Sequence, residues 1–403
     1  MIRVATVIRL LAICMALLLA MPAAASTSDD ALRDVAAWFA VDDKALDHWL
    51  PSAPGAADDR RILLQRKSAA DGPLQRVMVI YPRKSTAYDV AMSTMLHDFA
   101  ARQLNLEILA VNFARDPQRG ASLIAEARRE GYALVYAMGS ETAEWLYQDH
   151  RDIDIPVVTV CAKDPVQLGQ MPDYDRGSGN SFAFTSLNVL LDVQIGYLRE
   201  LKPQLKNVAI LVDEKNTSAV TTQARPIAEA LQRQGIQALK VAVTNPAQAK
   251  EQLATLVPAA VDEMRRSDPA LEQSVFWVTG STSVFSEIAT INAQSGKVPV
   301  LAVVPEVVQA GTDSAVLSIG VSFESNAQLA ALYGVDILTG KSRPASMKVG
   351  VVSPPDIAIN FLRAREIGLK IPFSFFEAAT FVFDADGRPA RIRGQTVSRQ
   401  PGG

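Results

Sequence analysis

Residues 297–341, KVPVLAVVPEVVQAGTDSAVLSIGVSFESNAQLAALYGVDILTGK, form the stretch of sequence that decides the fold. The almost unbroken apolar run over 298–304 is too short to span a membrane and is typical of a parallel strand buried on both faces. A short helical piece and a second apolar run, 315–319, follow it. Over 324–338 the apolar residues recur at helical spacing, and Gly340 stands where a helix-terminating glycine belongs. The stretch therefore predicts one β-α-β-α module.

The same alternation of strands and helices runs through most of the chain and begins anew near residue 207. The predicted strands cover 76–81, 106–111, 133–137, 155–160, 207–212, 238–243 and 274–278. Strands that alternate with helices favour parallel sheets, and the restart indicates two of them. At 403 residues, 49% of them hydrophobic, the chain is long enough to bury two cores. The predicted fold class is α/β, with two doubly wound parallel-sheet lobes.

The first 25 residues have the pattern of a signal peptide. Arg3 and Arg9 provide a positive start, 10–21 is apolar, and three alanines at 23–25 form a small-residue cleavage site. A retained anchor is the alternative, although the apolar part is too short to cross a bilayer. We therefore expect a periplasmic protein without direct membrane insertion.

Charge and cysteine content exclude several classes of protein. The formal net charge of −3 becomes −5 once the two arginines of residues 1–25 are removed, so nothing favours binding to nucleic acid or to an anionic membrane. Cys14 lies within the apolar part of the leader, which leaves Cys161 as the only cysteine and excludes an intramolecular disulfide. We interpret Cys161 as a packed thiol, because no base is near it in the pattern.

The segment between the leader and the first predicted strand, 26–75, reads as an N-terminal helical extension and linker. Two short amphipathic helices are expected over 29–39 and 43–50. Residues 51–59, rich in proline, alanine and glycine, have the composition of a linker.

Ligands of open α/β sheets bind beyond the carboxyl ends of the strands, and that rule selects the candidate site residues. Helix N-termini suit a carboxylate, an acidic side chain suits an ammonium group, and an aromatic ring can stack on a ligand. The alternative for each hydroxyl or amide is that it only caps a helix. The loop after the fourth strand also carries Cys161, Lys163 and Asp164. The candidate ligand-binding residues are Ser85, Thr86, Tyr88, Asp89, Ser140, Glu141, Thr142, Phe182, Asn216, Thr217, Ser281, Thr282 and Glu306.

The sequence contains no recognisable catalytic or metal-binding motif. None of the three histidines follows a predicted strand, and there is no nucleophile elbow, phosphate loop or paired-cysteine spacing. We expect no enzyme activity, no cofactor and no metal. An exported enzyme that uses Asp89 or Glu306 as its base is the alternative.

Short motifs in a fixed order carry a resemblance to a known family over about residues 76–372. The chain resembles the exported substrate-binding proteins of ABC importers of the tryptophan/tyrosine-binding type, which have the type I periplasmic binding protein fold. The motifs include Ala87-Tyr88-Asp89, Gly139-Ser140, Asp164-Pro165-Val166, Gly179-Asn180, Asn216-Thr217-Ser218 and Ile337-Leu338-Thr339-Gly340.

The resemblance implies a three-segment hinge between the lobes, with crossings near 182–188, 315–323 and 347–360. It implies that lobe I comprises 76–185 plus 316–346 and lobe II 186–315 plus 347–372, with 373–403 as a C-terminal tail. It further implies a monomer that binds a small molecule, an amino acid that is aromatic or related, and delivers it to an ABC permease in the inner membrane.

The chain departs from the family pattern at the cleft. Asn180–Ala183 replaces Asn-Val-Thr-Gly at the first crossing, Lys84-Ser85 replaces Glu-His, and Gly280 stands where an acidic residue is common. The identity of the ligand therefore stays open. A periplasmic sensor that reports ligand occupancy to a membrane receptor or kinase is the alternative function.

Overall fold

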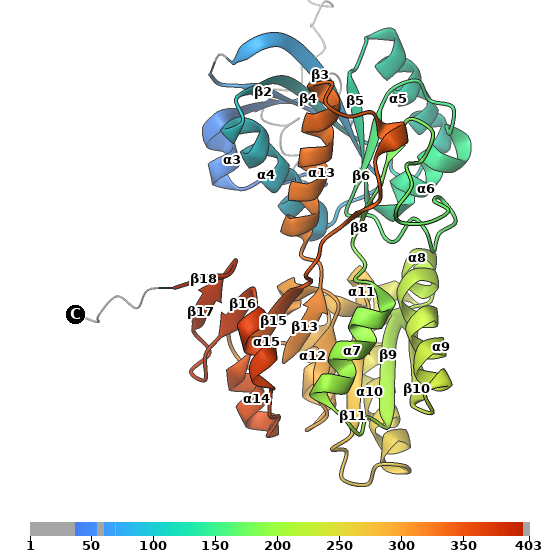
Figure 1. The fold of residues 1–403 in the computed structure, drawn as a ribbon, viewed down its shortest axis with the longest axis vertical. Coiled ribbons are helices and arrows are strands. Elements are labelled where there is room, and N and C mark those ends of the chain that lie inside the picture. The colour runs from blue at the N-terminus through green and yellow to red at the C-terminus, as the bar shows by residue number, and fades with distance from the viewer. Residues whose placement is uncertain (1–36, 55–59, 69, 398–403) are drawn as a thin grey trace, which may run out of the picture.

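The computed structural model describes residues 37–54, 60–68 and 70–397, and these form two α/β lobes stacked along the long axis of the molecule (Figure 1). The predicted α/β fold with two sheet-based lobes is confirmed. The proposed signal peptide, 1–25, lies outside the described residues. Within the described residues, no helix has the length and apolarity that a bilayer crossing requires.

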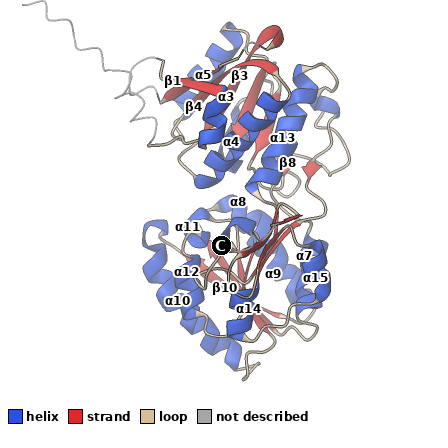
Figure 2. Ribbon diagram, turned by 90° about the vertical axis from the view of Figure 1, so that its left-hand side faces the viewer, coloured by secondary structure: helices blue, strands red, loops and turns tan. Residues whose placement is uncertain are grey.

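Lobe I is built on a seven-stranded sheet whose central strands are parallel. Across the sheet the strands are β1 (Trp49–Ser52), β2 (Arg61–Arg66), β4 (Leu104–Asn112), β3 (Asp71–Tyr81), β5 (Leu134–Met138), β6 (Val157–Val160) and β7 (Phe182–Ala183). Its helices are α3 (Asp43–His48), α4 (Thr86–Ala101), α5 (Pro117–Arg129), α6 (Gly139–Asp149) and α13 (Phe323–Leu338). Helices cover both faces of this sheet (Figure 2).

Burial on both faces explains why the central strands are apolar without alternation. In β3, Val77 and Val79 belong to the core under α4 and α13, whereas Met78 and Ile80 belong to the core under α5 and α6. All four side chains are fully buried.

Lobe II is built on a nine-stranded sheet that begins with five parallel strands. In order the strands are β10 (Gln237–Val243), β9 (Asn207–Asp213), β11 (Ser274–Val278), β12 (Val300–Ala302), β13 (Leu317–Gly320), β15 (Asp356–Asn360), β16 (Phe381–Phe383), β17 (Pro389–Ile392) and β18 (Gln395–Thr396). Its α-helices are α7 (Leu191–Leu201), α8 (Thr217–Ala219), α9 (Arg225–Arg233), α10 (Ala249–Arg265), α11 (Thr282–Phe285), α12 (Ile288–Gln294), α14 (Phe361–Ile367) and α15 (Phe373–Ala378).

The chain passes between the lobes three times. It leaves lobe I after β7 through β8 (Thr185–Ser186), returns from β13 into α13, and leaves again through β14 (Gly350–Val351) into β15. The strands β8 and β14 pair in parallel beside each other, so two of the crossings are hydrogen-bonded together. The return falls after Gly320: strand β13 pairs with β12 and β15 of lobe II, although we had expected lobe I to resume at 316.

The described part of the predicted N-terminal helical extension and linker instead belongs to lobe I, and two strands of it join the lobe I sheet. The expected helix over 43–50 ends at His48, and β1 pairs with β2, which pairs with β4. Trp49 fixes this edge because its side chain is fully buried and its Nε1 donates to the Leu96 carbonyl oxygen at 3.0 Å. Most of the helix expected over 29–39 lies outside the described residues.

The expected C-terminal tail also joins a sheet. Strand β16 pairs in parallel with β15, and β17 and β18 continue the sheet of lobe II in antiparallel pairs. Phe375 of α15 is fully buried. Residues up to 397 therefore extend lobe II beyond the predicted limit at 372.

Candidate functional site

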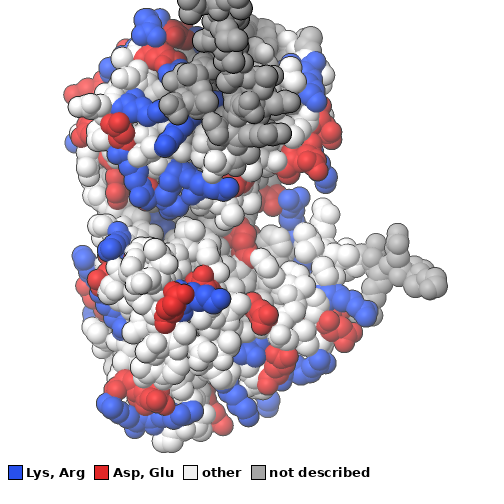
Figure 3. Space-filling model, turned by 180° about the vertical axis from the view of Figure 1, so that it is seen from behind, with Lys and Arg blue, Asp and Glu red and all other residues white. Residues whose placement is uncertain are grey.

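A polar and aromatic cleft lies where the two lobes meet. Its empty space is about 610 Å³, with the opening to solvent included. Figure 3 shows the waist between the lobes from behind, with lysine and arginine side chains gathered on the lobe I side. Its polar lining is Arg83, Ser85, Ser140, Glu141, Lys163, Asn216, Ser218, Gln223 and Thr282. Its main apolar lining is Tyr88, Leu187, Phe285, Val303, Val304, Val321 and Phe323.

Lobe I contributes the starts of two helices. Ser85 occupies the N-cap position of α4 but its side chain does not cap the helix, which leaves the hydroxyl for another partner. Helix α6 begins at Gly139, where φ is +79° and a Cβ atom would overlap the Tyr88 hydroxyl. Glycine at this position therefore allows Tyr88 to pack under the start of α6 and places Ser140 and Glu141 on the cleft.

Every charged side chain that lines the inner cleft belongs to lobe I. Glu141 accepts two hydrogen bonds from Arg115, at 2.7 and 2.8 Å, and one from Arg83 at 3.4 Å. Hydrogen bonding to Glu141 raises the pKa of Arg115 further above its ordinary value. Lys163 lies deeper, only 7% exposed, and its backbone N–H donates to Ser140 Oγ at 2.9 Å.

Lys163 also joins the two lobes. Its Nζ donates to the Gly280 carbonyl oxygen of lobe II at 3.1 Å. A Cβ atom at residue 280 would lie 3.1 Å from the same Nζ, so glycine permits this approach. Burial, followed by the positive charge of Arg83, lowers the pKa of Lys163 to about 8.

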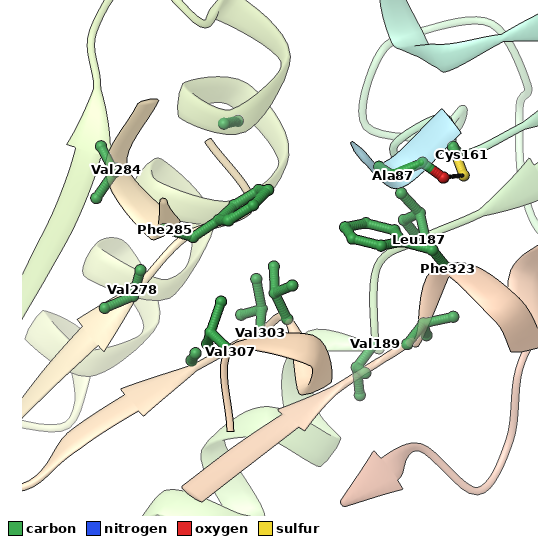
Figure 4. Close-up of a cluster of buried hydrophobic side chains, with 14 of the residues drawn as sticks. Ala87, Cys161, Leu187, Val189, Val278, Val284, Phe285, Val303, Val307 and Phe323 are labelled. Atoms are coloured by element: carbon green, nitrogen blue, oxygen red, sulfur yellow. Dashed lines mark hydrogen bonds between the residues drawn. The ribbon is translucent and has the colours of Figure 1, made fainter. Parts of the chain in front are cut away.

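Lobe II contributes neutral polar groups and an aromatic ring. Asn216 Oδ1 accepts from the Ala219 N–H at 3.1 Å, and Gln223 Oε1 accepts from the Gly280 N–H at 2.7 Å. Gln223 lies in a π-helical turn, Val220–Ala224, a type of helix distortion that is frequent at functional sites. Phe285 of α11 faces Phe323, at the start of α13, with ring centroids 6.3 Å apart (Figure 4).

The structure brings six of the thirteen predicted residues onto the cleft: Ser85, Tyr88, Ser140, Glu141, Asn216 and Thr282. These six come from both lobes. Each of them is at or near the start of a helix that follows a parallel strand, which is where the strand-end rule placed them.

The other seven predicted residues lie elsewhere. Thr86 and Thr217 are exposed away from the cleft lining, and Asp89 accepts a hydrogen bond from the Ala40 N–H at 3.1 Å. Thr142 is fully buried, and Ser281 is fully buried with its Oγ accepting from the Asp213 N–H at 3.4 Å.

Phe182 and Glu306 also lie behind the cleft walls. The Phe182 ring, which we had expected to stack on a ligand, is buried in the lobe I core against Phe184, with centroids 5.8 Å apart. Glu306 Oε1 accepts from the Phe323 N–H at 2.7 Å, at the second crossing. Burial raises the pKa of Glu306 to about 7.

The candidate list omitted Lys163, Gln223, Phe285 and Phe323, which line the cleft. Lys163 had a signal, since it follows the fourth strand. Gln223, Phe285 and Phe323 lie inside helices or after a crossing and had none. Cys161 also reaches the lining; its Sγ lies 3.8 Å from the Ala87 carbonyl oxygen, and burial raises the pKa of the thiol, in keeping with a packed cysteine (Figure 4).

Among the described residues, no group of three or more His, Cys, Asp or Glu side chains is placed to hold a metal ion.

A cleft between two α/β lobes, lined from both and crossed by three segments, defines a two-lobe ligand-binding protein. A family model described as ABC transporter substrate binding protein matches residues 93–382, so the chain belongs to that family. The family comprises binding proteins, which confirms the expectation that the chain is not an enzyme.

Similar proteins agree with this assignment. A tyrosine-binding protein from Clostridioides difficile is 21% identical over 64% of this chain and 69% of its own length. The structure of a domain from Streptococcus pneumoniae in complex with L-Trp has 19% identity and a TM-score of 0.59, over 77% of this chain and 100% of that one. A conserved domain protein from Vibrio cholerae also has 19% identity and a TM-score of 0.59, over 76% and 99%. At this identity the structural likeness shows the fold, which is the resemblance expected from the sequence motifs.

Proposed function

We propose that the protein is the periplasmic solute-binding component of an ABC importer, exported through the leader at 1–25. Membership of the substrate-binding family supports delivery of the bound solute to a permease in the inner membrane. The family assignment favours this role over the sensory alternative. As in the expectation from the sequence, the protein would act as a monomer.

The single observation that carries the proposal is the composition of the interlobe cleft. Hydroxyls, amides, charges and aromatic rings from both lobes converge there, and the Lys163–Gly280 hydrogen bond already joins the two walls. A solute that contacts both walls would favour the arrangement in which the lobes approach, and the permease would recognise that arrangement.

The ligand we propose is a small solute that combines a carboxylate with an apolar or aromatic part. Lys163 and the starts of α4 and α6 suit the carboxylate, whereas Phe285 and Phe323 suit the apolar part. Aromatic amino acids, expected from the sequence and named for two of the similar proteins, fall within this class.

The test uses mature protein that has been unfolded and refolded to remove bound solute. Thermal unfolding is measured against a broad panel of amino acids, organic acids and sugars, and X-ray scattering is recorded with and without each hit. We expect a concentration-dependent rise in the unfolding temperature, because a ligand that binds only the folded state stabilises it. A hit should also reduce the radius of gyration. If no compound of any class stabilises the protein, the solute-binding proposal fails.

A further inference from the structure

The deepest charged group of the cleft is an ammonium group without a counter-ion. Lys163 Nζ contacts the neutral Gly280 carbonyl oxygen at 3.1 Å, and no carboxylate of the described residues lies within ion-pair distance of it. Its side chain is almost completely buried. A buried charge is costly unless an opposite charge accompanies it. The missing partner is therefore a group that enters the cleft.

The carboxylate that lines the inner cleft is already neutralised. Glu141 is held by both nitrogens of the Arg115 fork and also by Arg83. A fork-on-carboxylate pair is among the strongest ion pairs in proteins. Glu141 is thus committed to its two arginines, and with Lys163 the lining carries a surplus of positive charge.

The neutral groups of the cleft show the same bias toward donors. A backbone N–H can only donate, so the bonds from Ala219 and Gly280 require the side-chain oxygens of Asn216 and Gln223 to face inward to the protein. Their NH₂ groups have no partner among the described residues. Ser140 Oγ likewise accepts from the Lys163 N–H and keeps its own proton to donate.

The remainder of the cleft is apolar. Phe285 and Phe323 face each other from opposite lobes, with Val303 beside them and Leu187 next to Cys161 (Figure 4). An apolar body of the size of a phenyl or isobutyl group suits such walls, since its burial removes apolar surface from water.

From this distribution of charges, donors and apolar walls, we infer that the ligand is a monocarboxylate with a compact apolar body and no ammonium group. Lys163 is its counter-ion, and Phe285 and Phe323 hold its body. The inference rests on the proposed function and narrows it: a zwitterionic amino acid would bring an ammonium group into an inner cleft whose lining carboxylate, Glu141, is held by two arginines. Asp213 lines only the outer part of the cleft, where its carboxylate accepts hydrogen bonds from Ser283 Oγ and from the Lys215 N–H.

The experiment compares ligands that differ only in their charged groups. Hydrocinnamate, phenylalanine and phenethylamine share a phenyl body and carry a carboxylate, both groups, and an ammonium group, respectively. Isocaproate, leucine and isoamylamine form the same series on an isobutyl body. Dissociation constants are measured by calorimetry on the refolded protein at pH 7. We expect one carboxylate to bind at least about ten-fold more tightly than its amino acid, and the amines not to bind.

A variant assigns the effect to the buried lysine. Lys163→Met should weaken carboxylate binding by about thirty-fold or more while the ligand-free protein unfolds at the same temperature or higher. Lys202→Met is the matched control, because Lys202 is also partly buried and has a lowered pKa but lies at the end of α7, away from the cleft. It should leave the dissociation constant unchanged.

The outcomes separate this inference from the proposed function. If phenylalanine or leucine binds as tightly as its carboxylate counterpart, or more tightly, the protein is a solute-binding protein but the inference is wrong. If Lys163→Met still binds the carboxylates with unchanged affinity, Lys163 is not the counter-ion of the ligand. If both carboxylates fail to bind while another compound of the broad panel does, the ligand class is wrong and the proposed function still holds.

Discussion

The two walls of the cleft offer a ligand different chemistry. The lobe I wall carries the charged side chains of the inner cleft, Arg83, Glu141 and Lys163, whereas the lobe II wall carries amides, hydroxyls and the Phe285 ring. Coulombic attraction acts over a longer range than contact between apolar surfaces. A charged solute would therefore be selected on lobe I first, and closure of lobe II would then test its shape. Recognition of charge would therefore lie with lobe I alone, whereas the apolar body would contact rings of both lobes, Phe285 and Phe323.

The lobe II wall of the inner cleft carries no charge because Glu306 does not line it. Glu306 precedes the second crossing, and its Oε2 is buried without a hydrogen-bond partner among the described residues. The residue as a whole is partly exposed, but its carboxyl group is buried. Burial raises its pKa to about 7, with the nearby carboxylates of Asp356 and Glu324 as smaller causes.

Glu306→Gln should produce the largest change in stability. Between the ordinary pKa of 4.5 and the folded value of about 7, the folded state binds more protons than the unfolded state, so the free energy of unfolding falls as the pH rises. Above pH 7 the buried charge costs about 3 kcal/mol. A neutral glutamine can keep the hydrogen bond from the Phe323 N–H. We expect the variant to be more stable by about this amount at pH 8, and equal to the parent near pH 4.5.

Denaturant unfolding at several pH values measures this difference, and calorimetry measures ligand affinity alongside it. Glu324→Gln is the control: it removes an ion pair to Arg393, whose side chain is largely exposed, and this should change stability by less than about 1 kcal/mol. Ligand affinity should be unchanged in Glu306→Gln. A loss of affinity would mean that the Glu306 carboxylate acts on the ligand from the lobe II side. The contrast between a charged lobe I wall and an uncharged lobe II wall would then be wrong.

Phe285→Ala tests the lobe II wall itself. The Phe285 ring is 8% exposed and faces Phe323, so its removal should weaken binding of a solute with a phenyl or isobutyl body by about 10- to 100-fold. Phe373→Ala, at an exposed ring of the same lobe, is the matched control and should have no effect on affinity. Calorimetry with hydrocinnamate and with propionate separates body from charge. An equal loss for both acids would mean that the ring acts on closure instead of on shape.

The sequence predicted the parts of the molecule that depend on burial. Central strands such as β3 are apolar on both faces, and that pattern is independent of the rest of the chain. The edges were harder to predict. In β2, Ile62 and Leu64 are buried while their neighbours are partly exposed, which is a strand pattern, but two such residues beside a Pro- and Gly-rich segment resemble a linker. The segment is a strand because it pairs with β4, more than forty residues further along the chain, and a local sequence pattern does not reveal such pairing.

The sequence predicted which loops form the site, but not which side chains of those loops face the cleft. The strand-end rule selected the starts of α4 and α6, but each successive residue of a helix points about 100° away from the previous one. Ser140 and Glu141 therefore face the cleft while Thr142 is buried in lobe I. Gln223 escapes any such rule, since it reaches Gly280 from a π-helical turn in the middle of a helical segment.

The smallest expected effect compares two serines that the sequence treated alike. Ser85 lines the cleft with a hydroxyl that does not cap α4, whereas Ser281 is fully buried and accepts from the Asp213 N–H. Ser85→Ala should weaken ligand binding by a few-fold and leave stability unchanged, since one neutral hydrogen bond contributes about 1 kcal/mol.

Ser281→Ala should do the reverse: it leaves a buried N–H with one acceptor fewer, which lowers the free energy of unfolding by about 1 kcal/mol while affinity stays within two-fold. Denaturant unfolding and calorimetry on both variants give the four numbers required. If Ser281→Ala loses affinity and keeps its stability, the hydroxyl serves the ligand, and the lobe II wall reaches one residue further back than the geometry of α11 implies. Each substitution removes one serine hydroxyl oxygen, so any difference between the two variants arises from the position of that hydroxyl. A hydroxyl on a cleft wall acts on ligand affinity, whereas a hydroxyl in the core behind the wall acts on stability.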